Sequence, residues 1–140
     1  MVPDLVVELP DGDVAPLLPH VDGAVFINLS PGVDADEVPP RTALAHLVGN
    51  RGPTVPLATW TPGEIGIQHM AGQRVTAFLA DRGCPVPDEG YVAAEHPKRG
   101  LVVKTYAAPA EEALGWLVEA CRRLCPLEIV YPWQAVVRTR

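Results

Sequence analysis

The chain of 140 residues is 48% hydrophobic and 20% charged, with a formal net charge of −6. This length and composition are typical of one globular domain and argue against wholesale disorder. The acidic balance argues against nucleic-acid binding, which needs a basic face. No apolar run approaches the roughly 20 residues of a membrane span and the N-terminus lacks a secretion signal, so we expect a cytoplasmic protein without a membrane partner.

The N-terminal part is acidic and is predicted to be rich in β-structure. Residues 1–50 contain eight acidic residues and one basic residue, Arg41. Strands are predicted where β-branched residues lie between Pro, Asp and Gly. The expected elements are strands at 5–9 and 24–29, an irregular segment at 14–21, a polar loop at 30–40 and a short helix at 41–48. We expect this acidic extension to belong to a single domain of residues 1–140.

A long helix is predicted at 62–82. The sequence Thr61-Pro62-Gly63-Glu64 fits a capping box with proline at the first helical position. Apolar residues then follow at helical spacing, and Gly83 with Pro85 supplies a stop. Glycines 66 and 72 would lie inside this helix, which indicates either close packing or the approach of a ligand to the backbone.

A second helix is predicted at 109–125, because its apolar residues keep the i, i+3, i+4, i+7 spacing and its terminal charges match the helix dipole. A β-hairpin is expected from the strands 91–96 and 101–106, joined by Pro97-Lys98-Arg99-Gly100. Further strands are expected at 57–60 and 128–138.

The order strand, helix, strand, strand, helix, strand resembles the ferredoxin-like plan, an α+β sandwich with two helices on one face of an antiparallel sheet. The plan would cover residues 57–138. Pro132 places the last strand at a sheet edge, and Pro56 requires the first strand to begin after it.

Cysteines and histidines do not form a recognisable metal or catalytic motif. Cys121 and Cys125 share the apolar helix face and are expected in the core, and the same is expected of Cys84. The four histidines form no metal-binding pattern, and no nucleophile elbow or phosphate-binding loop occurs. We therefore expect neither a metal nor a cofactor.

In the ferredoxin-like plan, one end of the domain would gather several polar side chains. The hypothetical acid/base residues there are His69, His96 and Glu64, since histidine beside carboxylates exchanges protons near neutral pH. The hypothetical ligand-binding residues are Trp60, Gln68, Lys98 and Arg99. Glu95, Arg122 and Arg123 would lie at the same end. A solvated rim of turns and caps is the alternative interpretation.

Three aromatic residues, Trp116, Tyr131 and Trp133, are expected to be exposed near an edge strand and to form an interface, or else to pack locally. With no catalytic motif, these residues favour a non-catalytic α+β binding or protein-interaction module, present as a homodimer or bound to a protein partner. A small cofactor-free enzyme of the isomerase, cyclase or monooxygenase type, with His69 or His96 as acid/base, is the first alternative. A regulatory domain that senses an anionic metabolite through Lys98 and Arg99 is the second.

Overall fold

The computed structural model describes residues 4–34, 55–68, 75–87, 90–96, 100–105 and 108–139. The strands are β1 (Leu5–Leu9), β2 (Ala24–Val33), β3 (Leu57–Thr61), β4 (Glu64–Gln68), β5 (Tyr91–His96), β6 (Gly100–Lys104) and β7 (Ile129–Thr139). The α-helices are α2 (Val75–Asp81) and α3 (Ala110–Leu124), and two 3-10 segments follow β1, η1 (Pro10–Gly12) and η2 (Ala15–Gly23).

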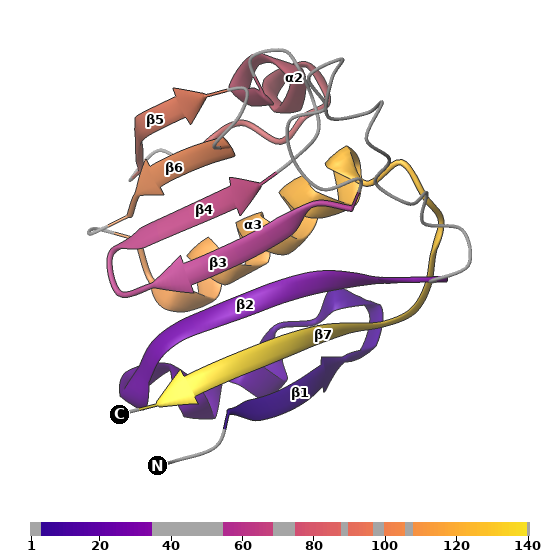
Figure 1. Cartoon of the computed structure of the whole chain (residues 1–140). Helices are drawn as coiled ribbons and strands as arrows, with labels where there is room; N and C mark the ends of the chain where they lie inside the picture. The colour runs from indigo at the N-terminus through magenta and orange to yellow at the C-terminus, as the bar shows by residue number, and fades with distance from the viewer. Residues whose placement is uncertain are drawn as a thin grey trace, which may run out of the picture.

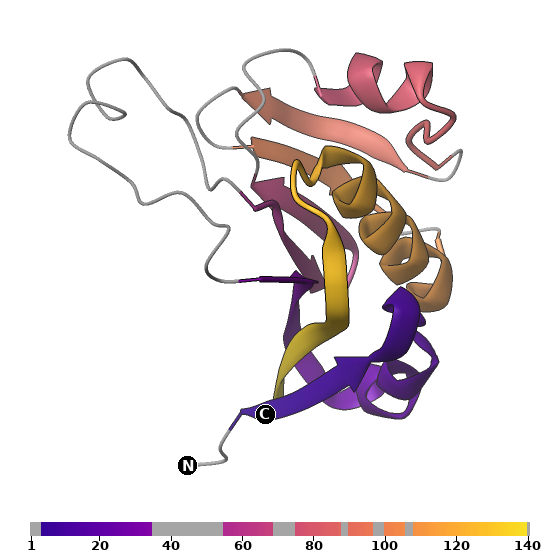
Figure 2. The same cartoon turned by 90° about the vertical axis from the view of Figure 1, so that its right-hand side faces the viewer.

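The described strands form one antiparallel sheet of seven strands in the order β1-β7-β2-β3-β4-β6-β5. Strands from both ends of the chain lie together, because β7 inserts between β1 and β2 (Figure 1). Both α-helices and the 3-10 segments lie on the same side of this sheet (Figure 2). The fold is therefore α+β, as expected, but the seven strands and their order depart from a ferredoxin-like sandwich.

The predicted helix at 62–82 is wrong over its first half. Thr61 to Glu64 form the tight turn of the β3–β4 hairpin, in which Gly63 has a φ of 85°. Proline followed by a positive-φ glycine is the pattern of a type II turn, which the capping-box interpretation overlooked. The described helix α2 (Val75–Asp81) lies within the last part of the predicted range. Gly66 is therefore a strand residue, while position 72 lies outside the described residues.

Other predicted elements agree with the structure more closely. The helix α3 and the β5–β6 hairpin are confirmed, and β1 has the predicted bounds. The strand β2 continues to Val33, into the expected polar loop, and the irregular segment is the 3-10 segment η2. The predicted helix at 41–48 lies outside the described residues.

The strand that contains Pro132 is not a sheet edge, because β7 pairs with β1 on one side and β2 on the other. Proline is tolerated there because the β1 pairing ends at Leu9↔Trp133 and the β2 pairing is bulged between Ser30 and Gly32. A Cβ on Gly32 would collide with the backbone of β7, so glycine permits this close crossing. Pro56 does precede β3, as the sequence required.

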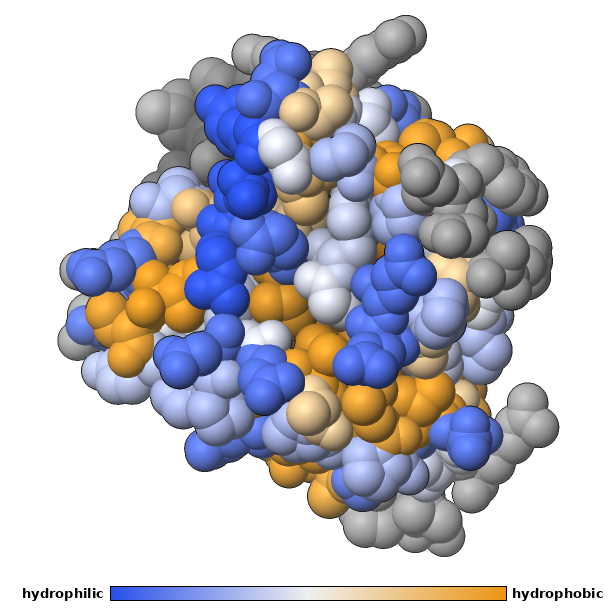
Figure 3. All heavy atoms as spheres, turned by 180° about the vertical axis from the view of Figure 1, so that it is seen from behind, coloured by the Kyte–Doolittle hydropathy of each residue, from blue (hydrophilic) through white to orange (hydrophobic). Residues whose placement is uncertain are grey.

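The core lies between the sheet and α3. The helix buries one continuous face, which includes Leu114, Leu117 and Cys121, against inward-facing residues of the sheet. Cys84 is buried as well, so the structure confirms a core position for both of these thiols. The outer surface of the helix-covered side mixes a hydrophilic band with apolar patches (Figure 3).

Candidate functional site

The face of the sheet opposite α3 carries no described helix, and strand alternation places uncharged side chains across its middle. The pairing registers align one transverse row over all seven strands, formed by Val6, Val136, Asn28, Thr59, Gly66, Val102 and Ala94. We call these seven residues the neutral row. Because strands lie about 4.8 Å apart, the neutral row extends roughly 29 Å across the sheet.

A concavity of about 500 Å³ lies over the centre of the neutral row. The described lining residues come from β2, β3, β4, β6 and β7, and none of them is titratable: Asn28, Leu29, Ser30, Leu57, Ala58, Thr59, Gly66, Ile67, Gln68, Leu101, Val102 and Val136. We call it the open-face concavity. It offers neutral hydrogen-bonding groups and apolar surface together.

Two ion pairs lie beside the neutral row. Lys104 Nζ lies 2.7 Å from Glu64 Oε1. Arg138 donates two hydrogen bonds to the Asp4 carboxylate, at 2.9 and 3.1 Å, and these bonds lower the pKa of Asp4. The guanidinium of Arg138 also lies 5.0 Å from the Phe26 ring. Glu8 of β1 is exposed on the same face and forms no ion pair with a described residue.

Asn28 and Thr59 fix each other at the centre of the concavity. The Thr59 hydroxyl donates a 2.8 Å hydrogen bond to Oδ1 of Asn28 across the β2–β3 pair. Beyond this bond, the side-chain amide of Asn28 retains its Nδ2 donors, and the Thr59 oxygen retains acceptor capacity. A carbonyl or hydroxyl group of a bound molecule would find both kinds of partner here.

Gly66 forms part of the floor, and the packing of the chain does not require a glycine there. Its φ is not positive, and a Cβ on Gly66 would contact only the Leu101 carbonyl oxygen, at an ordinary 3.5 Å. A glycine inside a strand weakens the strand, and it frequently marks the close approach of a ligand. Here it keeps the floor of the concavity open.

The structure separates the side chains that the sequence placed at one end of the domain. Trp60 is buried on the helix side, whereas Gln68 lies on the open face and lines the concavity. Glu64 and Gln68 occupy opposite ends of β4, because the predicted helix is a hairpin instead. Of the predicted ligand-binding residues that the structure describes, Gln68 alone lines the open-face concavity.

Glu95 has a structural role in the described region. Its carboxylate accepts hydrogen bonds from the backbone N–H of Thr76, at 2.8 Å, and from the Thr76 hydroxyl, at 2.9 Å. These bonds attach the first turn of α2 to β5. The predicted residues His69, Lys98 and Arg99, and the side chain of His96, lie outside the described residues, so their proposed roles stay predictions.

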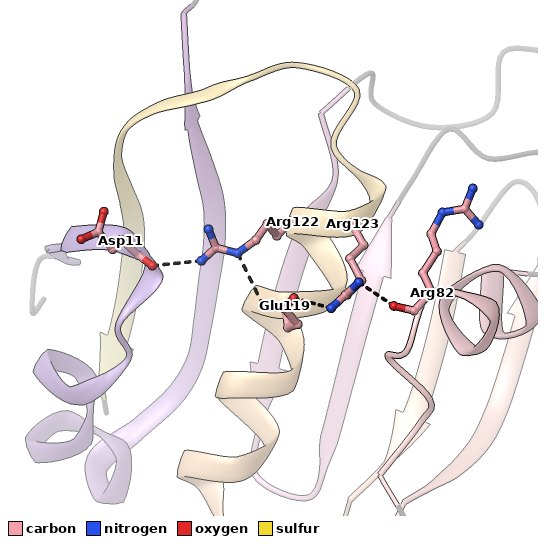
Figure 4. Close-up of polar contacts among 5 residues, drawn as sticks. All are labelled: Asp11, Arg82, Glu119, Arg122 and Arg123. Carbon is pink, nitrogen blue, oxygen red and sulfur yellow. Dashed lines mark hydrogen bonds and ion pairs between the residues drawn. The ribbon is translucent and has the colours of Figure 1, made fainter.

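Arg122 and Arg123 hold the end of α3 between two other segments (Figure 4). Arg122 donates a 2.9 Å hydrogen bond to the Asp11 carbonyl of η1, and Arg123 donates one to the Arg82 carbonyl after α2. Both guanidinium groups pair with Glu119, at 3.5 and 3.0 Å. These arginines lie on the helix side of the sheet, away from the open-face concavity.

The predicted interface residues differ in exposure. Trp133 is fully buried, so the expectation that it is exposed is wrong; inward alternation along β7 places it in the core. Trp116 is half-buried and donates a 2.8 Å hydrogen bond to the Pro85 carbonyl, which is the local-packing alternative. Tyr131 is 58% exposed and is the one of the three that presents a large surface to solvent.

The buried thiols are poorly suited to chemistry. Burial raises the pKa of Cys84, and it raises that of Cys121 far more, so both stay protonated near neutral pH. No group of three or more potential metal ligands occurs among the described residues. Within the same residues, no helix is long and apolar enough to cross a membrane.

Sequence reasoning missed the neutral row and the open-face concavity. The alternation in Glu64-Ile65-Gly66-Ile67-Gln68 was the available signal, since it has the period of a strand. Alignment of the row also depends on pairings between residues distant in sequence. Comparison with protein families, curated proteins and solved structures finds no match to this chain.

Proposed function

We propose that this protein is a non-catalytic binding module that holds an uncharged small molecule in the open-face concavity. The observation that carries the proposal is a space of about 500 Å³ whose described lining residues are all uncharged. Small-molecule sites usually have volumes of about 300–1,000 Å³ and combine apolar walls with a few polar groups. The open-face concavity has this size and this composition.

The lining favours a neutral ligand with a carbonyl or amide group and an apolar body. Asn28 and Thr59 supply a donor and an acceptor, while Val102 and Val136 supply apolar surface. A charged ligand would lose its hydration without meeting an opposite charge among the described lining residues, and the nearby cations Lys104 and Arg138 already pair with carboxylates. Neutral molecules avoid this cost.

Acid/base catalysis has less support at this place. A general acid or base must lie within hydrogen-bonding reach of the proton that it transfers. The lining residues that the structure describes include no His, Asp, Glu, Lys, Cys or Tyr. The enzymatic alternative therefore depends on His69 and His96, whose side chains lie outside the described residues.

The proposal is tested with a set of neutral fragments that carry a carbonyl or amide group on an aliphatic ring, followed by ¹H–¹⁵N NMR. We expect some fragments to shift the resonances of Asn28, Thr59, Gly66 and Val102. Gly66→Ile fills the floor of the concavity and should weaken binding by about tenfold, which corresponds to about 1.4 kcal/mol.

The matched control is Gly115→Ala in α3, where a Cβ contacts nothing within 4 Å and the site is on the other side of the sheet. This variant should bind the fragments as the wild type does. The proposal is wrong if no fragment shifts the neutral row, or if Gly66→Ile and Gly115→Ala bind equally well.

A homodimer through β1 is a second candidate, favoured by the exposure of that edge strand. Among the described strands, β1 pairs with β7 alone, and Leu5 and Val6 are 42% and 59% exposed. An unpaired edge with apolar side chains is a template for strand addition from another chain. Sedimentation should then show a dimer that Val6→Lys dissociates; a wild-type monomer at high concentration would exclude this assembly.

A further inference from the structure

A second cavity lies beside the open-face concavity, at the end of the β2–β7 pair. Its volume is about 240 Å³, and Ser30 lines both spaces. Strand alternation places Asn28, Ser30 and Gly32 on the same face of β2, so the two spaces follow one another along that strand. β2 and β7 lie side by side over this length (Figure 1). We call the second space the Tyr131 cavity.

The Tyr131 cavity lies at a β-bulge. The pairs Ser30↔Gln134 and Gly32↔Tyr131 are two residues apart on β2 but three residues apart on β7. The extra residue of β7 bends the strand and interrupts its pairing. Because cross-strand partners project to the same face of a sheet, Tyr131 lies on the open face together with Gly32. Glycine has no side chain, so no cross-strand neighbour covers the Tyr131 ring from that position.

Tyr131 presents an aromatic ring that the described part of the fold leaves largely in contact with solvent. The residue is 58% exposed, and it makes no hydrogen bond or cation–π contact with another described residue. Aromatic rings bury a large apolar area when they pack on one another, and they add a specific attraction in offset-stacked or edge-to-face geometry. The Tyr131 ring therefore favours an aromatic group of a ligand over an aliphatic one.

Uncharged polar groups lie on the path from the open-face concavity to the Tyr131 ring. Ser30 and Gln134 supply hydrogen-bond donors and acceptors, and the described lining residues of the Tyr131 cavity include no Asp, Glu, Lys, Arg or His. Glu8 of β1 lies opposite Gln134, is exposed and forms no ion pair with a described residue. Its carboxylate repels an anionic group at this end of the path. The path therefore suits a ligand without negative charge.

We propose that the open-face concavity and the Tyr131 cavity together bind an elongated, uncharged amide with an aromatic ring at its far end. This inference rests on the function proposed above and names the class of its ligand. The amide binds at Asn28 and Thr59, the connecting chain passes Ser30, and the ring packs against Tyr131. Asn28 and Gly32 are four residues apart in one strand, so the ligand must span roughly 13 Å.

The test compares N-cyclohexylacetamide with longer N-cyclohexyl amides that end in a phenyl ring on alkyl linkers of increasing length. In ¹H–¹⁵N NMR, both kinds of amide should shift the resonances of Asn28 and Thr59. Only the longer amides should also shift those of Gln134 and Tyr131. The linker that spans roughly 13 Å should give about tenfold tighter binding than the short amide, because the phenyl ring is buried against Tyr131.

Tyr131→Ala should weaken the binding of the best long amide about tenfold and leave the binding of N-cyclohexylacetamide unchanged. Val130→Ala is the matched control, because Val130 is the neighbouring residue, is 52% exposed and lines neither of the two spaces. A carboxylate on the phenyl ring should weaken the binding of the long amide, and Glu8→Gln should recover part of that loss.

The possible failures separate this inference from the function on which it rests. If the short amide shifts the neutral row and no longer amide binds more tightly, the elongated ligand is excluded and the proposed function stands. If neither kind of amide shifts the neutral row, the proposed function fails as well. Equal weakening by Tyr131→Ala and Val130→Ala would place the ring elsewhere, and an undiminished affinity for the carboxylate would exclude the uncharged class. If Tyr131→Ala does not fold, Tyr131→Leu, which keeps an apolar side chain without the ring, makes the same comparison.

Discussion

Replacing Gly66 should stabilise the fold while it blocks the open-face concavity. Gly66 lies inside β4, opposite Thr59 on β3 and Val102 on β6. An isoleucine there gains β-propensity, which spans about 1 kcal/mol between poor and good strand residues. It also forms cross-strand contacts with both neighbours, each worth about 0.2–1 kcal/mol. The Leu101 carbonyl at 3.5 Å imposes no steric penalty.

These contributions partly overlap, because host-protein propensities already include some side-chain packing. We therefore expect Gly66→Ile to raise the free energy of unfolding by about 1 kcal/mol, which raises Tm by about 3–5 °C for a chain of this size. Urea unfolding measures the change, and an unaltered m-value would show that both states keep their compactness. Gly66→Ala should give a smaller gain of the same sign.

A loss of stability in Gly66→Ile would refute this reasoning, because it would mean that the strand needs glycine for its own packing. Equal stability of the variant and the wild type would show that the added methyl groups find no contacts. In either case, the absence of a side chain at position 66 would no longer point to a ligand. If Gly66→Ile gains stability but loses fragment binding, the glycine at position 66 serves binding and is not needed for folding.

Three further predictions concern the framework around the two cavities. Glu95→Ala should lower the free energy of unfolding by about 2 kcal/mol, since it leaves the amide and hydroxyl of Thr76 without their charged acceptor; a double-mutant cycle with Thr76→Val in urea measures the coupling. Because the pKa of Cys121 is raised, folding holds the thiol protonated, and stability should fall as pH rises above about 8.5, by up to about 1.4 kcal/mol per pH unit for this thiol. Cys121→Ala should reduce this slope in pH-dependent urea curves, and the raised pKa of Cys84 accounts for a remaining slope of the same sign. Because the pKa of Asp4 is lowered, its pair with Arg138 should contribute above about pH 3.9 and be lost as pH falls further; Asp4→Asn should flatten this acid limb in thermal melts.

Local sequence patterns correctly predicted the elements whose residues fit one structural interpretation. The helix α3 follows directly from its apolar face and its terminal charges, and the β5–β6 hairpin follows from its turn residues. The error at 62–82 arose where two local rules compete. Thr-Pro-Gly-Glu suits both a helix start and a type II turn, and the alternation after Glu64 decides for the turn.

Non-local pairing explains what the sequence could not predict. The position of β7 between β1 and β2 joins residues more than a hundred positions apart, as in Leu5↔Val137. This pairing makes β7 a central strand, so its inward residues, Trp133 among them, enter the core. It also aligns Val136 with Asn28, and this alignment is required for the neutral row to cross the sheet. Period-2 patterns identify faces within a strand but not which strand lies beside it.

Gly66 and Trp133 share one feature: neither is the residue that would give its own position the greatest stability. At position 66 a β-branched residue would make a better strand, and at position 133 an aromatic ring without a polar atom would leave no unsatisfied donor in the core. Each residue therefore costs the fold some stability, and each lines a cavity. Departures from local consistency of this kind concentrate at functional sites. Gly66 lies in the floor of the open-face concavity, so the stability that it costs supports the binding role proposed for that face of the sheet.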